Sequence, residues 1–179
     1  MKFLIFLLAF FSLNAIPAEI LIIRHAEKPP EGEHLDQKGW ERAFALAPFF
    51  KGRAEMLEFG PPVAIYAMGQ HKEESSLRPQ ETVQEVAKVL NLTPVTRFIK
   101  GEEREMVEEI LKNSEYSNKT VLICWEHKEI EEIVKAFDFP APSKWHGSVF
   151  DRVYKLNLQN GKRGFQNLPQ RLLFDDSNH

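Results

Sequence analysis

Three short and nearly continuous apolar runs constrain the fold of this chain most strongly. They are EILIIR at 19–24, VAIYAM at 63–68 and TVLICW at 120–125. A strand with one solvent-facing side alternates apolar and polar residues, whereas a strand covered on both faces is apolar throughout. The three runs therefore predict central strands of a sheet that is covered on both sides.

Helical patterns separate these runs. Apolar residues follow helical spacing over 36–50, 83–90, 106–111 and 130–137. Asp36 is placed to cap the first helix, Leu35 and Trp40 to form a hydrophobic staple, and Pro79 suits the first turn of the second helix. Strands joined by helices of this length pair in parallel through crossover connections. We expect an α/β fold, a three-layer α/β/α sandwich around a mostly parallel sheet.

The C-terminal part predicts an antiparallel edge to that sheet. Residues 149–168 contain two strand-like runs around Asn160-Gly161, a pair of residues that favours a tight hairpin turn. The 179-residue chain has the length of one ordinary domain. We expect a single domain over residues 19–174 and a flexible polar tail over 175–179.

The first 18 residues have the organisation of a secretory signal. Lys2 precedes a long apolar run, and small residues with a proline follow it. Cleavage could follow Ala15 or Ala18, and the alternative is an uncleaved anchor, although the run is shorter than the ~20 residues of a membrane span. We expect an exported protein, periplasmic or secreted, without a stable membrane partner once the signal is removed.

Charge and cysteine content narrow the function classes. The formal net charge of −3 at pH 7 argues against a nucleic-acid partner, because a polyanion is bound by basic surfaces. Cys124 is the single cysteine, so no intramolecular disulfide can form, and its place in an apolar run predicts a small buried side chain.

Cationic side chains follow the ends of the predicted strands. Arg24 and His25 end the first strand, Arg78 follows the second, and His127 follows the third. The carboxyl ends of parallel strands share one sheet edge, so we expect these side chains to converge. Such a cluster repels itself unless it holds an anion, and arginine forks suit phosphate oxygens. Neutral imidazole can in addition carry a phosphoryl group covalently.

These motifs resemble a known family. RHAEKP is similar to the Arg-His-Gly signature of the histidine phosphatase superfamily, the phosphoglycerate mutase-like phosphatases. SSLRPQET resembles its second arginine motif, and VLICWEH resembles the strand that delivers its second histidine. HLDQKGWERA and FDRVYKL extend the likeness over nearly the whole exported chain. The resemblance implies a small member of the first branch, with a phosphoglycerate mutase-like fold.

The resemblance also implies roles for individual residues. His25 becomes the phosphorylated nucleophile, and Arg24, Arg78 and His127 become the phosphate pocket around it. Ala26 replaces the usual glycine of the signature, which requires a backbone without positive φ at that position.

The general acid is less well defined by the resemblance. Glu102 occupies the usual interval after the second arginine, with Glu103 as its neighbour. Glu126, next to the second histidine, and Glu27, in the first motif, are further candidates. A carboxylic acid in this role needs a raised pKa to stay protonated.

We therefore expect a phosphatase that hydrolyses phosphomonoesters, either small molecules or phosphopeptides, without metal or cofactor. Residues His25, Glu27, Glu126 and His127 match no zinc-binding spacing, and two arginines nearby would repel a cation. The alternative function is a catalytically weak or inactive phosphate-binding or partner-binding protein of the same fold.

Overall fold

The computed structural model describes residues 16–53, 56–71, 76–140, 142–159 and 161–177. Its strands are β1 (Glu19–Arg24), β2 (Ala64–Ala67), β3 (Thr120–Trp125), β4 (Arg152–Asn157) and β5 (Gly164–Pro169). Its α-helices are α1 (Gln37–Gly52), α2 (Arg78–Leu90), α3 (Glu103–Lys112) and α4 (Ile130–Ala136), and a short 3₁₀ helix covers Ser114–Tyr116. The three apolar runs are the strands β1, β2 and β3, as predicted.

The strands form one sheet in the order β2-β3-β1-β4-β5. β3 pairs in parallel with both β1 and β2, whereas β4 and β5 add an antiparallel edge. The register of β1 against β3 runs from Glu19 beside Thr120 to Arg24 beside Trp125. The predicted α/β fold with a mostly parallel centre and an antiparallel edge is confirmed.

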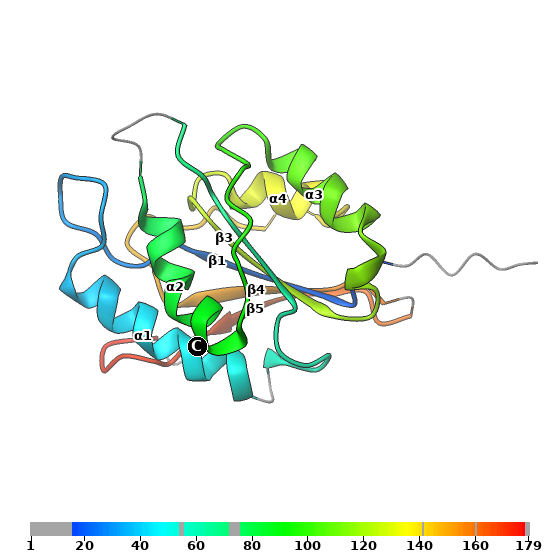
Figure 1. The fold of residues 1–179 in the computed structure, drawn as a ribbon, viewed down its shortest axis with the longest axis horizontal. Helices are drawn as coiled ribbons and strands as arrows, with labels where there is room; N and C mark the ends of the chain where they lie inside the picture. The colour runs from blue at the N-terminus through cyan, green and yellow to red at the C-terminus, as the bar shows by residue number, and fades with distance from the viewer. Residues whose placement is uncertain (1–15, 54–55, 72–75, 141, 160, 178–179) are drawn as a thin grey trace, which may run out of the picture.

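Alternate residues of β1 separate the two cores of the sandwich. Ile20 and Ile22 pack with apolar residues of α3 and α4 on one face of the sheet. Leu21 and Ile23 pack with α1 and α2 on the opposite face. Figure 1 shows the two helix pairs on opposite sides of the strands. Because β1 is covered on both faces, its sequence is apolar at every position from 20 to 23.

The helix starts follow the expected local chemistry. The Asp36 side chain caps α1 by accepting the Gly39 N–H at 2.7 Å. Leu35 and Trp40 meet in one small apolar cluster, as the staple requires. Pro79 lies in the first turn of α2, where a missing N–H costs nothing.

A segment that the sequence analysis left unassigned covers the other edge of the sheet. Val95 forms a parallel bridge with Tyr66 on β2. Its carbonyl accepts the N–H of Ala67 at 3.0 Å, and its N–H donates to Ile65 at 2.8 Å. Backbone groups of Ile65 and Ala67 at the outer edge of β2 are therefore paired by the segment that contains Val95.

Residues on both sides of the predicted domain contact it. Ala18 is fully buried, donates to the Lys119 carbonyl at 2.9 Å and accepts the Leu158 N–H at 2.8 Å. The rest of the predicted signal, residues 1–15, lies outside the described residues. Two residues of the predicted tail contact α1: Asp175 pairs with Lys38 at 2.6 Å, and Asp176 forms a buried ion pair with Arg42 at 2.7 Å. Within the described residues, no helix is long and apolar enough to cross a membrane.

Candidate active site

The ends of β1 and β3 and the start of α2 bring the predicted site residues together. The His25 N–H donates to the Trp125 carbonyl at 3.1 Å, which extends the β1–β3 ladder by one residue. His127 follows two residues after β3, and Arg78 opens α2 beyond β2. The charges of Arg24, Arg78 and His127 all act on the His25 ring. The convergence predicted for one sheet edge is therefore present.

His25 is a buried and neutral imidazole with a defined tautomer. The residue is only 3% exposed, and its Nδ1 lies 2.7 Å from the Ala26 carbonyl oxygen. A carbonyl can only accept, so Nδ1 carries the proton and Nε2 keeps its lone pair. Burial, and then the neighbouring cations, lower the pKa of His25 to about 4 against the opposing Ala26 hydrogen bond. Near neutral pH the ring is therefore uncharged, with a lone pair on Nε2.

Arg24 is held in place through its Nη1 atom and by a ring contact. Its Nη1 donates to the carbonyls of Gly147 at 2.8 Å and Val149 at 3.0 Å. The guanidinium carbon lies 3.8 Å from the centre of the Phe150 ring, a cation–π contact. Burial lowers the pKa of Arg24 to about 10, so the group stays charged. Its buried Nε has no hydrogen-bond partner among the described residues.

His127 shares this pattern. Its Nδ1 is buried and also has no partner in the part of the chain that the structure describes. On the other side of the ring, a β-carbon added to Gly147 would come within 3.4 Å of Nε2. Burial and the charge of Arg24 lower the pKa of His127. A buried polar atom without a partner costs free energy, so both nitrogens are available to a ligand: Arg24 Nε as a donor, and His127 Nδ1 as a donor in the tautomer that protonates it.

Arg78 is less buried than Arg24 and His25. Its Nε donates to the His34 carbonyl at 3.3 Å, and Nη2 donates to the Gly32 carbonyl. These contacts tie the start of α2 to the loop that follows β1. Burial lowers the pKa of Arg78, while Glu81 and Glu126 favour its charge.

The two glutamates nearest the start of α3 have local partners. Glu102 Oε2 accepts the Ile99 N–H at 3.0 Å. Glu103 is buried, and its Oε1 accepts both the indole N–H of Trp125 and the Gly101 N–H at 3.0 Å. Within the part of the chain that the structure describes, neither carboxylate forms a hydrogen bond or an ion pair with His25. Glu103 instead joins α3 to the end of β3.

The other two acid candidates form ion pairs with basic side chains. Burial opposes ionisation of Glu126, but the ion pair with Lys100 at 3.0 Å outweighs it and lowers the pKa of that carboxyl. Glu27 binds Arg42 through three hydrogen bonds of 2.7 to 3.1 Å. A general acid must be protonated before the reaction, so these pairings disfavour both residues in that role.

Ala26 has the backbone conformation that the sequence required, and it forms a hydrogen bond that the sequence did not predict. Ala26 is not among the described residues with positive φ, so the alanine fits without strain. Its N–H donates to the hydroxyl of Thr82 at 2.8 Å, and Thr82 donates in turn to the Arg78 carbonyl at 2.7 Å. Thr82 was not predicted, although its position four residues after Arg78 places both on one face of α2.

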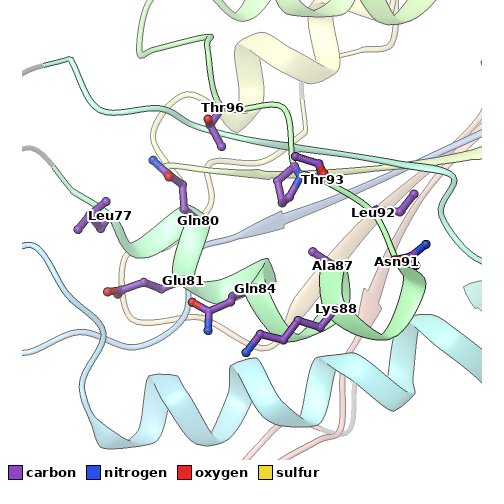
Figure 2. A pocket seen from close by; sticks show the side chains of 11 residues that line it. Leu77, Gln80, Glu81, Gln84, Ala87, Lys88, Asn91, Leu92, Thr93 and Thr96 are labelled. Carbon is purple, nitrogen blue, oxygen red and sulfur yellow. The ribbon is translucent and has the colours of Figure 1, made fainter.

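A groove of about 590 Å³ lies elsewhere, along α2 and residues 91–96. Figure 2 shows Gln80 and Gln84 on the helix and Thr93 and Thr96 on the segment after it. None of the predicted site residues lines this groove. No group of three or more His, Cys, Asp or Glu side chains in the described ranges is placed to hold a metal ion.

Known proteins similar to this chain were found by comparison of structures. No protein-family model and no curated protein matches it. The protein histidine phosphatase SixA, solved with tungstate, superposes with a TM-score of 0.59 at 15% identity, over 85% of this chain and 97% of that chain. A phosphoserine phosphatase mutant from Entamoeba histolytica, solved with phosphoserine, superposes with a TM-score of 0.59 at 13% identity, over 87% and 98%.

Both solved structures belong to the histidine phosphatase superfamily. The superpositions establish the architecture of this chain. At identities of 15% and 13%, they establish nothing finer. The predicted phosphoglycerate mutase-like fold is therefore confirmed.

Proposed function

We propose that this protein is an exported phosphatase that hydrolyses phosphomonoesters through a phosphohistidine on His25, without a metal ion. One observation carries the proposal: two buried nitrogens without partners among the described residues, Arg24 Nε and His127 Nδ1, belong to side chains that act electrostatically on the neutral His25 imidazole, whose Nδ1 holds the proton. A phosphoryl group supplies acceptor oxygens for these two nitrogens and an electrophilic phosphorus for the imidazole. The architecture shared with solved phosphatases supports the same assignment.

The first half-reaction transfers the phosphoryl group to the protein. His25 Nε2 attacks phosphorus, a P–N bond forms, and the bond from phosphorus to the ester oxygen breaks. The ester oxygen keeps the electron pair of that bond and takes a proton from solvent. Arg24 neutralises charge on the non-bridging oxygens, His127 donates a hydrogen bond to them, and Arg78 adds a second positive charge near the ring. Because the Ala26 carbonyl holds the Nδ1 proton, the phosphorylated ring remains oriented by the same hydrogen bond.

The second half-reaction returns the protein to its starting state. Water attacks phosphorus, the P–N bond breaks, inorganic phosphate leaves, and the electron pair returns to Nε2. Splitting one displacement into two is the advantage of covalent catalysis. No step needs an oxidant, a reductant or a further substrate.

Turnover of an aryl phosphate between pH about 4 and about 8 tests this function, because a good leaving group needs little assistance from an acid. His25→Ala should abolish both turnover and the acid-labile phosphoenzyme. His71→Ala is a matched control, since His71 is an exposed histidine outside the cluster. Full activity of His25→Ala would refute the assignment. Binding of phosphate or vanadate without any turnover would favour a non-catalytic phosphate-binding protein.

The engaged carboxylates favour phosphoramidates as a second candidate substrate class. Glu103 binds the Trp125 indole, Glu126 binds Lys100 and Glu27 binds Arg42. An imidazole leaving group, whose ordinary pKa is near 6.5, departs near neutral pH without a carboxylic acid, whereas a serine alkoxide needs a proton. Fold similarity to a protein histidine phosphatase supports this class.

Competition between the two substrate classes decides this point. We expect faster hydrolysis of phosphoimidazole or a phosphohistidine peptide than of a phosphoserine peptide of the same sequence. Glu103→Gln and Glu102→Gln should leave the phosphohistidine rate unchanged. A preference for phosphoserine that either variant removes would instead identify a general acid and favour phosphomonoesters.

A further inference from the structure

We propose that Asp176 positions the nucleophile from the C-terminal part of the chain, acting through Arg42, Glu27 and the Ala26 carbonyl. The inference rests on the proposed role of His25 and adds a positioning residue that lies 151 positions away in the sequence. Figure 1 shows the red C-terminal segment running beside α1, the helix that carries Arg42.

Arg42 is the centre of a buried charge network. Its Nη2 donates to Glu27 and to Asp176, both at 2.7 Å, and its Nη1 donates to Asp176 at 3.0 Å and to Gln170 at 2.9 Å. The side chains of Arg42 and Asp176 are each 3% exposed, and that of Glu27 is 10% exposed. Removing one partner from a buried pair leaves the other charge uncompensated, so the network has one strongly preferred arrangement.

Asp176 is itself fixed by a local turn. Its Oδ2 accepts the backbone N–H groups of Leu172 at 2.8 Å and Leu173 at 3.1 Å. Burial opposes ionisation, but the hydrogen bonds from Arg42 and from these two amides outweigh it and lower the pKa of Asp176. The local turn therefore holds an ionised Asp176 carboxylate beside Arg42. The two hydrogen bonds to this carboxylate fix the direction of the Arg42 guanidinium group.

The network reaches His25 through one peptide unit. The Ala26 carbonyl, which accepts the His25 Nδ1 proton, shares a planar peptide group with the Glu27 N–H. On the far side, the Glu27 carbonyl accepts the Asp36 N–H at 3.2 Å. A β-carbon added to Gly39 would lie only 2.2 Å from that oxygen, so α1 packs directly against it. Movement of Glu27 therefore rotates the carbonyl that sets the His25 tautomer.

The neighbouring residue provides a matched control. Asp175 also forms an ion pair with α1, at 2.6 Å from Lys38. Its side chain is 62% exposed, and Lys38 reaches Glu27 only at 4.0 Å. Asp175→Asn and Asp176→Asn thus remove one formal charge each from adjacent positions, but only the second removes it from the buried network.

The decisive experiment measures the tautomer and the rate in the same three proteins. Nitrogen NMR of labelled imidazoles should show His25 protonated on Nδ1 in the wild type and in Asp175→Asn, and a tautomer mixture in Asp176→Asn. In Asp176→Asn the kcat for an aryl phosphate should fall roughly 10- to 100-fold, as expected for a displaced catalytic group. Inhibition by inorganic phosphate should be unchanged, because Arg24, Arg78 and His127 are intact.

The two readouts separate this inference from the proposed function. An inactive wild type with the predicted tautomer shift would refute the function and leave the positioning contact supported. An active wild type whose tautomer and kcat are unchanged in Asp176→Asn would overturn the inference alone. If Asp176→Asn does not fold, Asp176→Glu keeps the charge and moves it by one methylene, and the same two outcomes apply.

Discussion

The hydroxyl of Thr82 accepts the Ala26 N–H at 2.8 Å and donates to the Arg78 carbonyl at 2.7 Å. One fully buried side chain thus links the loop after β1 to the first turn of α2. Ala26 directly follows the proposed nucleophile His25, and Arg78 is the second arginine of the candidate site.

Replacing Thr82 with valine keeps the shape and removes the hydroxyl. We expect Thr82→Val to lower the free energy of unfolding by about 1–3 kcal/mol, because the buried Ala26 N–H loses its acceptor. The kcat for an aryl phosphate should fall as well. Thr82→Ser retains the hydroxyl and should keep most of the activity. Urea unfolding and steady-state kinetics measure both effects, and a Thr82→Val protein with wild-type kcat would argue against the link.

The contact between Phe150 and Arg24 predicts an effect on anion affinity. The ring lies 3.8 Å from the guanidinium carbon and makes an edge contact with His25 at 6.1 Å between ring centres. Phe150→Leu should weaken inhibition by phosphate or vanadate roughly 3- to 30-fold, the range of a lost cation–π contact. Phe44→Leu is the control, since Phe44 is exposed on α1. Equal inhibition constants in wild type and Phe150→Leu would contradict the prediction.

The buried imidazole of His25 predicts a pH dependence of stability. Its pKa is about 4 in the folded protein against an ordinary value of 6.5. Between these values the unfolded chain binds a proton that the folded protein does not, so this contribution to stability is lost as the pH falls from 6.5 towards about 4. Wild type should therefore lose more stability than His25→Asn over this window, measured by urea unfolding.

His34 provides the opposite case. The hydrogen bond and charge of Glu81 raise the pKa of His34, so its contribution is present at low pH and is lost as the pH rises through the folded pKa. The stability difference between wild type and His34→Asn should grow on acidification, whereas that for His25→Asn should shrink. Parallel pH profiles for the two variants would contradict these assignments.

The contacts of Ala18 predict where the mature chain begins. Ala18 is fully buried and forms two backbone hydrogen bonds, to Lys119 and from Leu158. A chain that starts at residue 16 should therefore be more stable than one that starts at residue 19, by about 1–3 kcal/mol for the amide and carbonyl groups left unpaired. If the protein is exported with cleavage, we expect the N-terminus to be Ile16. Thermal unfolding of the two chains, and N-terminal sequencing of the exported form, test this.

Local patterns were sufficient to predict the elements and the placement of the cations. The apolar run at 20–23 determines a strand covered on both faces, and the geometry of parallel strands then brings Arg24 and His127 to one edge. The Asp36 cap and the Pro79 helix start depend on only a few neighbouring residues, which a sequence displays directly.

Contacts between distant residues were not predictable in the same way. Arg24 donates to the Gly147 carbonyl, and Arg42 to Asp176, across more than a hundred positions in each case. Such contacts depend on loop paths and on side-chain rotamers that no local period encodes. The same limit explains why four glutamates remained acid candidates: the partners that hold Glu27 and Glu103 are identified only by tertiary packing.

Ala26 has a consequence for recognising other chains of this kind. Its methyl group is fully buried in the cluster with Leu35 and Ala43, and its φ lies in the ordinary negative range. Glycine there would leave a methyl-sized void and cost about 0.8 kcal/mol of burial. A search pattern that insists on glycine after the histidine would pass over this chain, whereas a pattern that accepts any small side chain at that position would detect it.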